Sequence, residues 1–161
     1  MPVVYLGIGS NIGKREENCL RAIGLMEENG LKITKRSAMY ETEPWGVEDQ
    51  PAFINMAVEA ETNASPHELL LLLKRIESEA GRRPGIKWGP RVLDIDILLY
   101  ENLRVNEEGL SIPHPLMHER TFVLRPLAEI APDVIHPVLR KTVGQLLSGQ
   151  ASGPDCRHGE R

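Results

Sequence analysis

Two aspartates separated by one residue give the clearest chemical signal in the sequence. They lie in the apolar segment LDIDILLY, residues 93–100, which has the composition of a buried strand. Alternate side chains of a strand share a face, so we expect Asp94 and Asp96 to emerge together. The core face would then carry Leu93, Ile95, Ile97 and Leu99. Carboxylates about 6 to 7 Å apart along a strand suit two hard cations that bridge phosphate oxygens.

The alternative for these aspartates is a solvated sheet face that happens to carry two acids. Asp is uncommon in strands, and like charges on one face repel each other, so a metal site is favoured. A run of basic residues directly precedes them. Residues 82–91, RRPGIKWGPR, hold four cations within ten positions, next to two glycines and two prolines.

Such a loop could bind a polyphosphate beside the metal ions. Its glycines and prolines suit a lid that closes over a ligand, and Trp88 could cover a flat ring. An ordinary solvated basic loop is the commoner outcome for such runs. The neighbouring aspartates favour the phosphate-binding interpretation.

The opening segment GIGSNIGK, residues 7–14, follows a strand and precedes a helix, as phosphate-binding loops do. Its glycine spacing fits no Walker loop, and Ile12 stands where a dinucleotide fingerprint requires glycine. We interpret it as a tight strand-to-helix turn, either structural or facing the substrate. Further along, Asn55 projects from a predicted strand beside Phe53 and is a candidate hydrogen-bonding group in an aromatic-lined pocket.

Hydrophobic periodicity predicts the elements that position these residues. Strands are expected at Val3–Ile8, Leu31–Tyr40, Phe53–Glu61 and Val92–Tyr100. Helices are expected at Lys14–Glu28, Leu69–Ala80, Arg120–Ile130 and Val143–Leu147. This order predicts an α+β fold, a ferredoxin-like α/β/α sandwich around a mainly antiparallel sheet. We expect a single domain over residues 1–148 and a disordered tail over residues 149–161.

The composition excludes several classes of protein. The chain has 161 residues, of which 41% are hydrophobic and 26% charged, so a soluble globular domain is expected. A net charge of −4 disfavours general binding to nucleic acid. The two cysteines lack metal-ligand spacing, and no signal peptide or long apolar run is present, so we expect a cytoplasmic protein without a membrane partner.

Taken together, these motifs resemble the hydroxymethyl-dihydropterin pyrophosphokinase family. The most specific segment of the resemblance runs from Trp88-Gly89-Pro90-Arg91 to Leu93-Asp94-Ile95-Asp96. It is joined by the Gly-Ser-Asn turn, Tyr40-x-Thr42, Pro44-x-Gly46, Phe53-Ile54-Asn55, Pro113-His114 and Arg120-x-Phe122. Members of this family transfer pyrophosphate from ATP to the hydroxymethyl group of a dihydropterin in folate biosynthesis, and release AMP.

The resemblance implies a role for each matching residue. Asp94 and Asp96 would hold two Mg²⁺ ions on the triphosphate. The implied ATP-binding residues are Glu77, Arg82, Arg91, Ile97, His114 and Arg120, and Arg82, Arg91 and Asp96 would also be catalytic. The implied pterin-binding residues are Thr42, Pro44, Trp45, Gly46, Phe53, Asn55, Trp88 and Phe122. The expected partners are therefore these two small molecules, bound by a monomer, with no nucleic acid and no membrane.

Two other classes of function would use some of the same features. A sandwich that binds single-stranded nucleic acid could use residues 82–91, but such modules place several aromatic residues on a basic sheet face. Aromatic residues make up only 4% of this chain. A metal-dependent nucleotidyl transferase or nuclease would use the same two aspartates. Incubation with Mg-ATP and hydroxymethyl-dihydropterin, followed by detection of AMP, distinguishes these possibilities.

Overall fold

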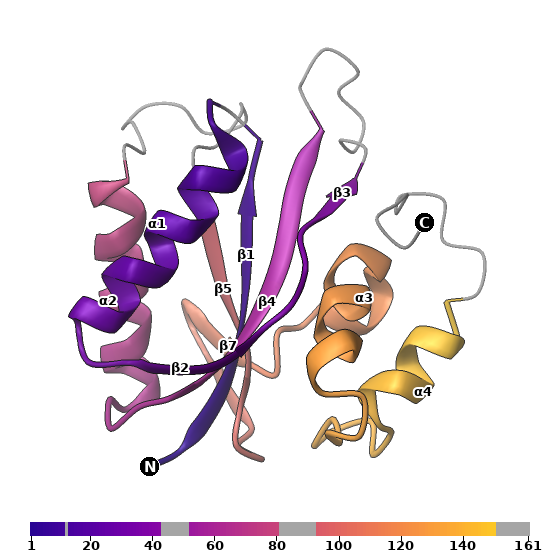
Figure 1. Cartoon of the computed structure of the whole chain (residues 1–161). Helices are drawn as coiled ribbons and strands as arrows, with labels where there is room; N and C mark the ends of the chain where they lie inside the picture. Colours follow the sequence, from indigo (N-terminus) through magenta and orange to yellow (C-terminus); the bar gives the residue numbers. More distant parts are fainter. Residues whose placement is uncertain (12, 43–51, 81–92, 151–161) are drawn as a thin grey trace.

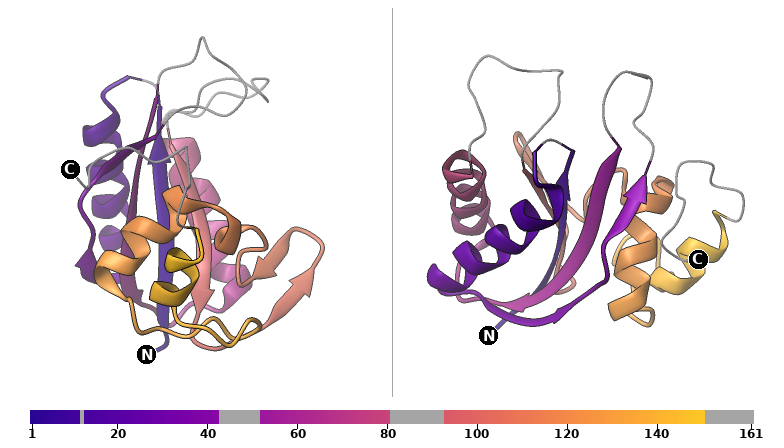
Figure 2. Two further views of the ribbon diagram at one scale, coloured as in Figure 1. Left: turned by 90° about the vertical axis from the view of Figure 1, so that its right-hand side faces the viewer. Right: turned by 45° about the horizontal axis from the view of Figure 1, so that its top comes forward.

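A central sheet is covered by helices on both faces in the computed structural model of the chain, which describes residues 1–11, 13–42, 52–80 and 93–150 (Figure 1). The strands of the sheet are β1 (Val3–Ser10), β2 (Lys32–Arg36), β3 (Tyr40–Thr42), β4 (Phe53–Glu61) and β5 (Asp94–Tyr100). The helices are α1 (Arg15–Glu28), α2 (Pro66–Glu79), α3 (Thr121–Ile130) and α4 (Val143–Ser148). Helices α1 and α2 cover one face, and α3 and α4 cover the other (Figure 2). None of the helices in the described ranges combines the length and the apolar character needed to cross a membrane.

The topology is that of a split β-α-β-β-α-β unit. The strand order is β2-β4-β1-β5, with β3 also paired to β4, and each of these pairings is antiparallel. This is the ferredoxin-like arrangement, so the predicted α+β sandwich is confirmed. A separate hairpin, β6 (Val105–Glu107) and β7 (Leu110–Ile112), and a short 3₁₀ helix, η1 (Met117–Glu119), follow β5. The sequence analysis did not predict that hairpin.

The side chains of β1 point alternately to the two faces of the sheet and contribute to two apolar cores. Val4, Leu6 and Ile8 point toward α1 and α2, whereas Tyr5 points toward α3 and α4. The helices contribute buried residues at helical spacing to each core. Those of α1 and α2 are Cys19, Ala22, Ile23, Met26, Leu69, Leu73 and Ile76. Those of α3 and α4 are Leu124, Leu127, Val143 and Leu146. Because side chains on both faces of the sheet are buried, the register between its strands is fixed.

Two expectations about the strands are wrong. Residues 31–40 do not form one strand, because the Ser37 hydroxyl accepts the Ala57 N–H at 2.9 Å, as a ladder carbonyl would, and β2 ends at Arg36. The expectation that Leu99 shares a face with Ile95 is also wrong. The register of β5 against β1 shifts after Ile97, and Leu99 packs in the core beneath α3 and α4.

Leu73→Ala should lower the free energy of unfolding by about 2 to 5 kcal/mol, because Leu73 is buried where α2 meets the sheet and its truncation leaves a cavity. Leu71→Ala is the matched control on the same helix. Its side chain is 68% exposed, so its loss should change the free energy of unfolding by less than about 0.5 kcal/mol. Urea unfolding of both variants measures the difference. Equal values would contradict the packing of α2 described above.

Candidate active site

Strand β1 presents two glycines between the polar side chains of its neighbours. Gly9 pairs with Asp94 on β5 and with Asn55 on β4, and Gly7 pairs with Asp96 on β5. Directly opposed residues of antiparallel strands point to the same face, so the two carboxylates and the amide lie on one side of the sheet. This is the side of α3, opposite the core that α1 and α2 cover. Gly7 and Gly9 thus leave a stretch of β1 backbone without side chains, here called the glycine strip, between the carboxylates and the amide.

This strip has little room for a side chain of its own. A Cβ atom at Gly9 would lie 3.0 Å from Oδ1 of Asn55, closer than most real Cβ contacts. A Cβ atom at Gly7 would lie 3.5 Å from the side chain of Leu98, an ordinary van der Waals distance. The requirement for glycine is therefore stricter at position 9, where a methyl group would displace the amide.

The β4 side of the strip holds predicted substrate-binding residues. Nδ2 of Asn55 donates to Oγ1 of Thr42 at 2.9 Å, and Thr42 is buried. Phe53 begins β4 and lies beside Gly9. Helix α3 packs against β3 and β4, and the guanidinium of Arg120 lies 5.6 Å from the ring centroid of Phe122 at the start of that helix. This side combines a fixed amide with aromatic rings, as recognition of a flat polar ring requires.

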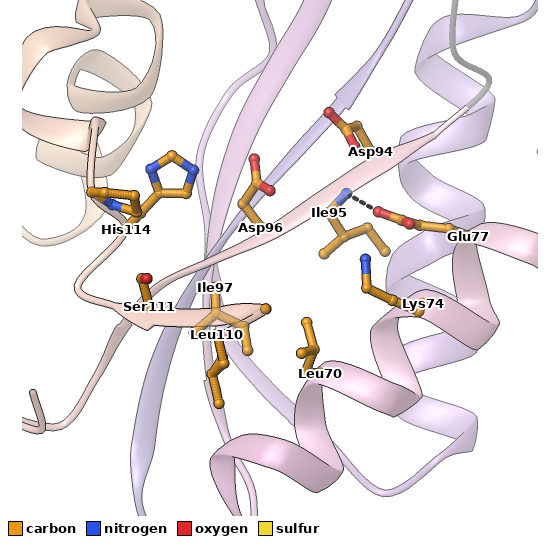
Figure 3. A pocket seen from close by; sticks show the side chains of 12 residues that line it. Leu70, Lys74, Glu77, Asp94, Ile95, Asp96, Ile97, Leu110, Ser111 and His114 are labelled. Carbon is orange, nitrogen blue, oxygen red and sulfur yellow. Dashed lines mark hydrogen bonds between the residues drawn. The ribbon is translucent and has the colours of Figure 1, made fainter. Parts of the chain in front are cut away.

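The β5 side of the strip opens into a pocket of about 350 Å³ (Figure 3). The pocket lies along β5, between α2 and the turn of the β6–β7 hairpin. The predicted nucleotide-binding and metal-binding residues among its walls are Glu77, Asp94, Asp96, Ile97 and His114. Because β5 is at the edge of the sheet, its outer backbone groups face this pocket rather than another strand.

Glu77 connects α2 to β5 between the two aspartates. Its side chain is buried, and its Oε2 accepts the backbone N–H of Ile95 at 2.7 Å (Figure 3). The bond satisfies a backbone donor on the outer edge of β5 and fixes the strand relative to the helix. Glu77, to which the family resemblance gives a nucleotide-binding role, is thus in contact with the strand that carries Asp94 and Asp96.

Burial and two neighbouring acids raise the pKa of the Asp96 carboxyl group. Burial raises the pKa of Asp96 to about 7, and repulsion by Asp94 and Glu77 adds to the effect, while Arg120 and Lys74 oppose it. A divalent cation beside Asp96 would relieve this repulsion, so the chemistry of the donor set fits a metal ion. Among the described residues no group of three or more His, Cys, Asp or Glu side chains is arranged around one metal position. Oxygens of a ligand and water can complete the coordination of an ion held by the aspartates.

His114 supplies a neutral donor on the opposite wall of the pocket. Burial lowers its pKa, and the positive charge of Arg120 lowers it further, against the attraction of Asp94. Its Nδ1 lies 3.2 Å from the backbone nitrogen of Leu116, which donates to it. The ring proton is then on Nε2, where it can be donated to an oxygen of a ligand.

Six predicted site residues lie outside the described residues: Pro44, Trp45, Gly46, Arg82, Trp88 and Arg91. The sequence analysis assigned no role to Lys74 or Ser111, which line the pocket. Lys74 precedes Glu77 by three residues on α2, so helical spacing could have placed it at the same site. The hairpin that brings Ser111 to the pocket has strands of three residues, too short for a periodic signal.

The chain is similar to several known proteins. Residues 5–132 match the family model described as 7,8-dihydro-6-hydroxymethylpterin-pyrophosphokinase (HPPK). A 2-amino-4-hydroxy-6-hydroxymethyldihydropteridine pyrophosphokinase of Aquifex aeolicus is 45% identical over 156 residues, which are 97% of each chain. A mitochondrial folate synthesis bifunctional protein of Arabidopsis thaliana is 48% identical over 127 residues, 79% of this chain and 23% of that protein.

Among solved structures, HPPK-DHPS of Plasmodium falciparum superposes with a TM-score of 0.72 at 19% sequence identity. The superposition covers 94% of this chain and 44% of that one. At this level of identity the likeness concerns the fold, and it agrees with the α/β/α arrangement described above.

Gly9→Ala should displace the Asn55 side chain, because the added methyl group would lie 3.0 Å from its Oδ1. We expect a loss of about 1 to 3 kcal/mol in the free energy of unfolding and a shift of the Asn55 side-chain amide signals in NMR spectra. Gly24→Ala on α1 is the control, since its Cβ would meet open space among the described residues. That change should be neutral or stabilising, by up to about 1 kcal/mol. Unmoved Asn55 signals in the Gly9 variant would contradict the close approach.

Proposed function

The chain belongs to the 7,8-dihydro-6-hydroxymethylpterin-pyrophosphokinase family, and from this membership we propose which of its residues carry the reaction. It is an enzyme of folate biosynthesis that transfers pyrophosphate from ATP to the hydroxymethyl group of 6-hydroxymethyl-7,8-dihydropterin. The oxygen of the substrate alcohol forms a bond to the β-phosphorus, the bond from that phosphorus to the oxygen bridging to the α-phosphate breaks, and AMP leaves.

One observation supports the assignment of the two substrates to opposite sides of β1. Asp94 and Asp96 lie on the β5 side of the glycine strip and Asn55 lies on the β4 side, all on one face of the sheet. ATP is therefore assigned to the pocket along β5, and the pterin to the residues on β3, β4 and α3. The alcohol meets the β-phosphate over the strip, where Gly7 and Gly9 leave the approach open.

Each side offers chemistry suited to its assigned substrate. Asn55 can pair with the amide and amino edge of the pterin, because its bond to Thr42 fixes its orientation. Phe53 and Phe122 would cover the faces of the ring. On the ATP side, His114 supplies a donor for phosphate oxygens, Ile97 lines the pocket and Glu77 positions β5. Arg120 is assigned to the phosphates as well, because its charge acts on both Asp96 and His114 although its guanidinium lies beside Phe122.

Asp94 and Asp96 are the residues that would hold Mg²⁺, and we assign two ions to them together with the triphosphate. Bound Mg²⁺ would neutralise charge that develops on the phosphate oxygens. Asp96 is also assigned to orienting the hydroxyl group and accepting its proton. Arg82 and Arg91 as phosphate contacts, and Pro44, Trp45, Gly46 and Trp88 as pterin contacts, rest on the sequence alone. Because residues of one chain serve both substrates, we assign the activity to a monomer.

The product analysis gives the primary test of the function. With ATP, Mg²⁺ and hydroxymethyl-dihydropterin all present, we expect equal amounts of AMP and pterin diphosphate, separated by anion-exchange chromatography. Omission of any one component should abolish both products. Formation of ADP would mean transfer of a single phosphate and would contradict the proposal, as would release of AMP without the pterin.

Asp94→Asn and Asp96→Asn should each lower kcat by at least about a hundredfold, because a neutral amide binds a hard cation weakly. The fold should survive both changes. At pH 8 and without metal, the unfolding midpoint of the Asp96 variant should equal or exceed that of the parent, since one of three mutually repelling carboxylates is removed.

Asp133→Asn is the matched control, because Asp133 is an exposed aspartate between α3 and α4. It should leave both kcat and the midpoint unchanged. Full activity of either site variant at ordinary Mg²⁺ concentrations would exclude the metal-binding role. A large loss of stability at Asp94 or Asp96 would indicate a structural role in its place.

A further inference from the structure

Strand β3 depends on contacts from outside the sheet. It has three residues and pairs only with β4 among the described strands, with Thr42 opposite Phe53 and Glu41 opposite Ile54. A pairing this short is marginal without further support. The strand nevertheless carries the hydroxyl group of Thr42, which fixes Asn55.

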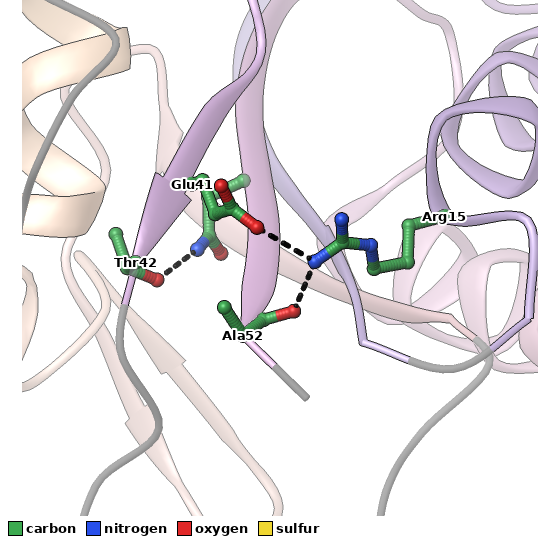
Figure 4. A network of polar contacts seen from close by, with 5 residues as sticks. Arg15, Glu41, Thr42 and Ala52 are labelled. Atoms are coloured by element: carbon green, nitrogen blue, oxygen red, sulfur yellow. Dashed lines mark hydrogen bonds and ion pairs between the residues drawn. The ribbon is translucent and has the colours of Figure 1, made fainter. Parts of the chain in front are cut away.

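Arg15, the first residue of α1, contacts both strands of this pair (Figure 4). Its Nη1 donates to the backbone carbonyl of Ala52, immediately before β4, at 2.6 Å. The same nitrogen lies 3.1 Å from Oε2 of Glu41 on β3. One guanidinium therefore bridges β3 and β4 at the end where Thr42 faces Phe53.

The two contacts of Arg15 differ in how much they contribute to stability. The Glu41 side chain is 56% exposed, and an ion pair in such a position contributes little to stability. The Arg15 side chain is only 25% exposed, and its bond to the Ala52 carbonyl is charge-assisted and short. The carbonyl contact thus anchors the guanidinium beside β4, and the ion pair with Glu41 is its link to β3.

The bridge and the Thr42–Asn55 bond hold the strand pair from opposite faces. Side chains alternate along β3, so Glu41 points toward α1 while Thr42 points toward Asn55 and the glycine strip. Removing the bridge on the α1 side would let the end of β3 move away from β4. Thr42 would move with it, and the Asn55 amide would lose the partner that fixes its orientation.

We propose that Arg15 is a positioning residue for pterin recognition, which acts by holding β3 against β4 so that Thr42 keeps the Asn55 amide oriented toward the substrate. This inference rests on the pterin-binding role proposed above for Asn55. Arg15 is on the opposite side of the sheet from the substrate, and its effect passes through Glu41, Ala52 and Thr42. It is therefore expected to affect the pterin and not the nucleotide, whose pocket lies along β5.

The test compares the binding of the two substrates in Arg15→Ala. Titrations with hydroxymethyl-dihydropterin, in the presence of a non-hydrolysable ATP analogue and Mg²⁺, should show a dissociation constant raised about tenfold, the effect expected for one charge-assisted bond. The dissociation constant of the ATP analogue should change less than about twofold. In steady state, KM for the pterin should rise far more than kcat falls.

Three variants complete the experiment. Arg15→Lys should restore most of the pterin affinity, because a single nitrogen makes both contacts and an ammonium can replace it. Glu41→Ala should raise the pterin dissociation constant about two- to fivefold, less than Arg15→Ala, because it removes the contact of Arg15 with β3 while the Ala52 contact remains. Arg21→Ala, an exposed arginine on the same helix, should change neither affinity. If Arg15→Ala fails to fold, Glu41→Ala carries the test, and an unchanged pterin dissociation constant in that variant would overturn the role of the bridge.

The outcomes separate this inference from the proposed function. A parent chain that binds no pterin would overturn the proposed function itself. A parent that binds pterin, with an Arg15→Ala variant that binds it equally well, would overturn only the role of Arg15. Equal losses of pterin and nucleotide affinity would also overturn it, because they would indicate general loosening of the fold.

Discussion

The hydrogen bond from the Ile95 N–H to the buried carboxylate of Glu77 is the contact on which the site depends. Strand β5 lies at the edge of the sheet, where a slip by one residue would exchange its acidic face for its apolar face. Glu77 accepts the one N–H between Asp94 and Asp96, and so ties the strand to α2 in the productive register. The same carboxylate adds negative charge beside Asp96. Glu77 therefore both positions β5 and adds to the negative charge of the site. Three neighbouring acids suit a substrate that binds as a complex with metal ions.

In the proposed assignment, different elements of the sandwich bind the two substrates. Helix α2 and the β6–β7 hairpin form walls of the pocket that we assign to ATP, while α3 and the short strand β3 flank the residues that we assign to the pterin. Between them β1 contributes only backbone at Gly7 and Gly9, although its intervening residue Ile8 is fully packed in the core. The two binding regions can thus be built from separate elements and still meet over one strand.

The parts of this arrangement that the sequence predicted are those with a local periodic signal. Alternation in residues 93–97 placed both aspartates on one face, and helical spacing located α1 and α2. The features that it missed depend on residues distant in the sequence. The shift at Leu99 arises from pairing with β1, the break after Arg36 from the Ser37 hydroxyl, and the role of Glu77 from a strand eighteen residues away. No pattern within a single segment contains that information.

The charges on the two outer strands have a second consequence, for association between molecules. An open edge strand offers unpaired backbone groups to any other chain, and such edges promote aggregation unless they are blocked. On β5 the acids of the site and the capture of the Ile95 N–H by Glu77 obstruct a foreign strand. At the other side of the sheet, β2 carries Lys32, Lys35 and Arg36, all exposed, whose charges a docking strand would have to bury. On β5, therefore, the residues assigned to the reaction also help keep the molecules apart in a crowded solution.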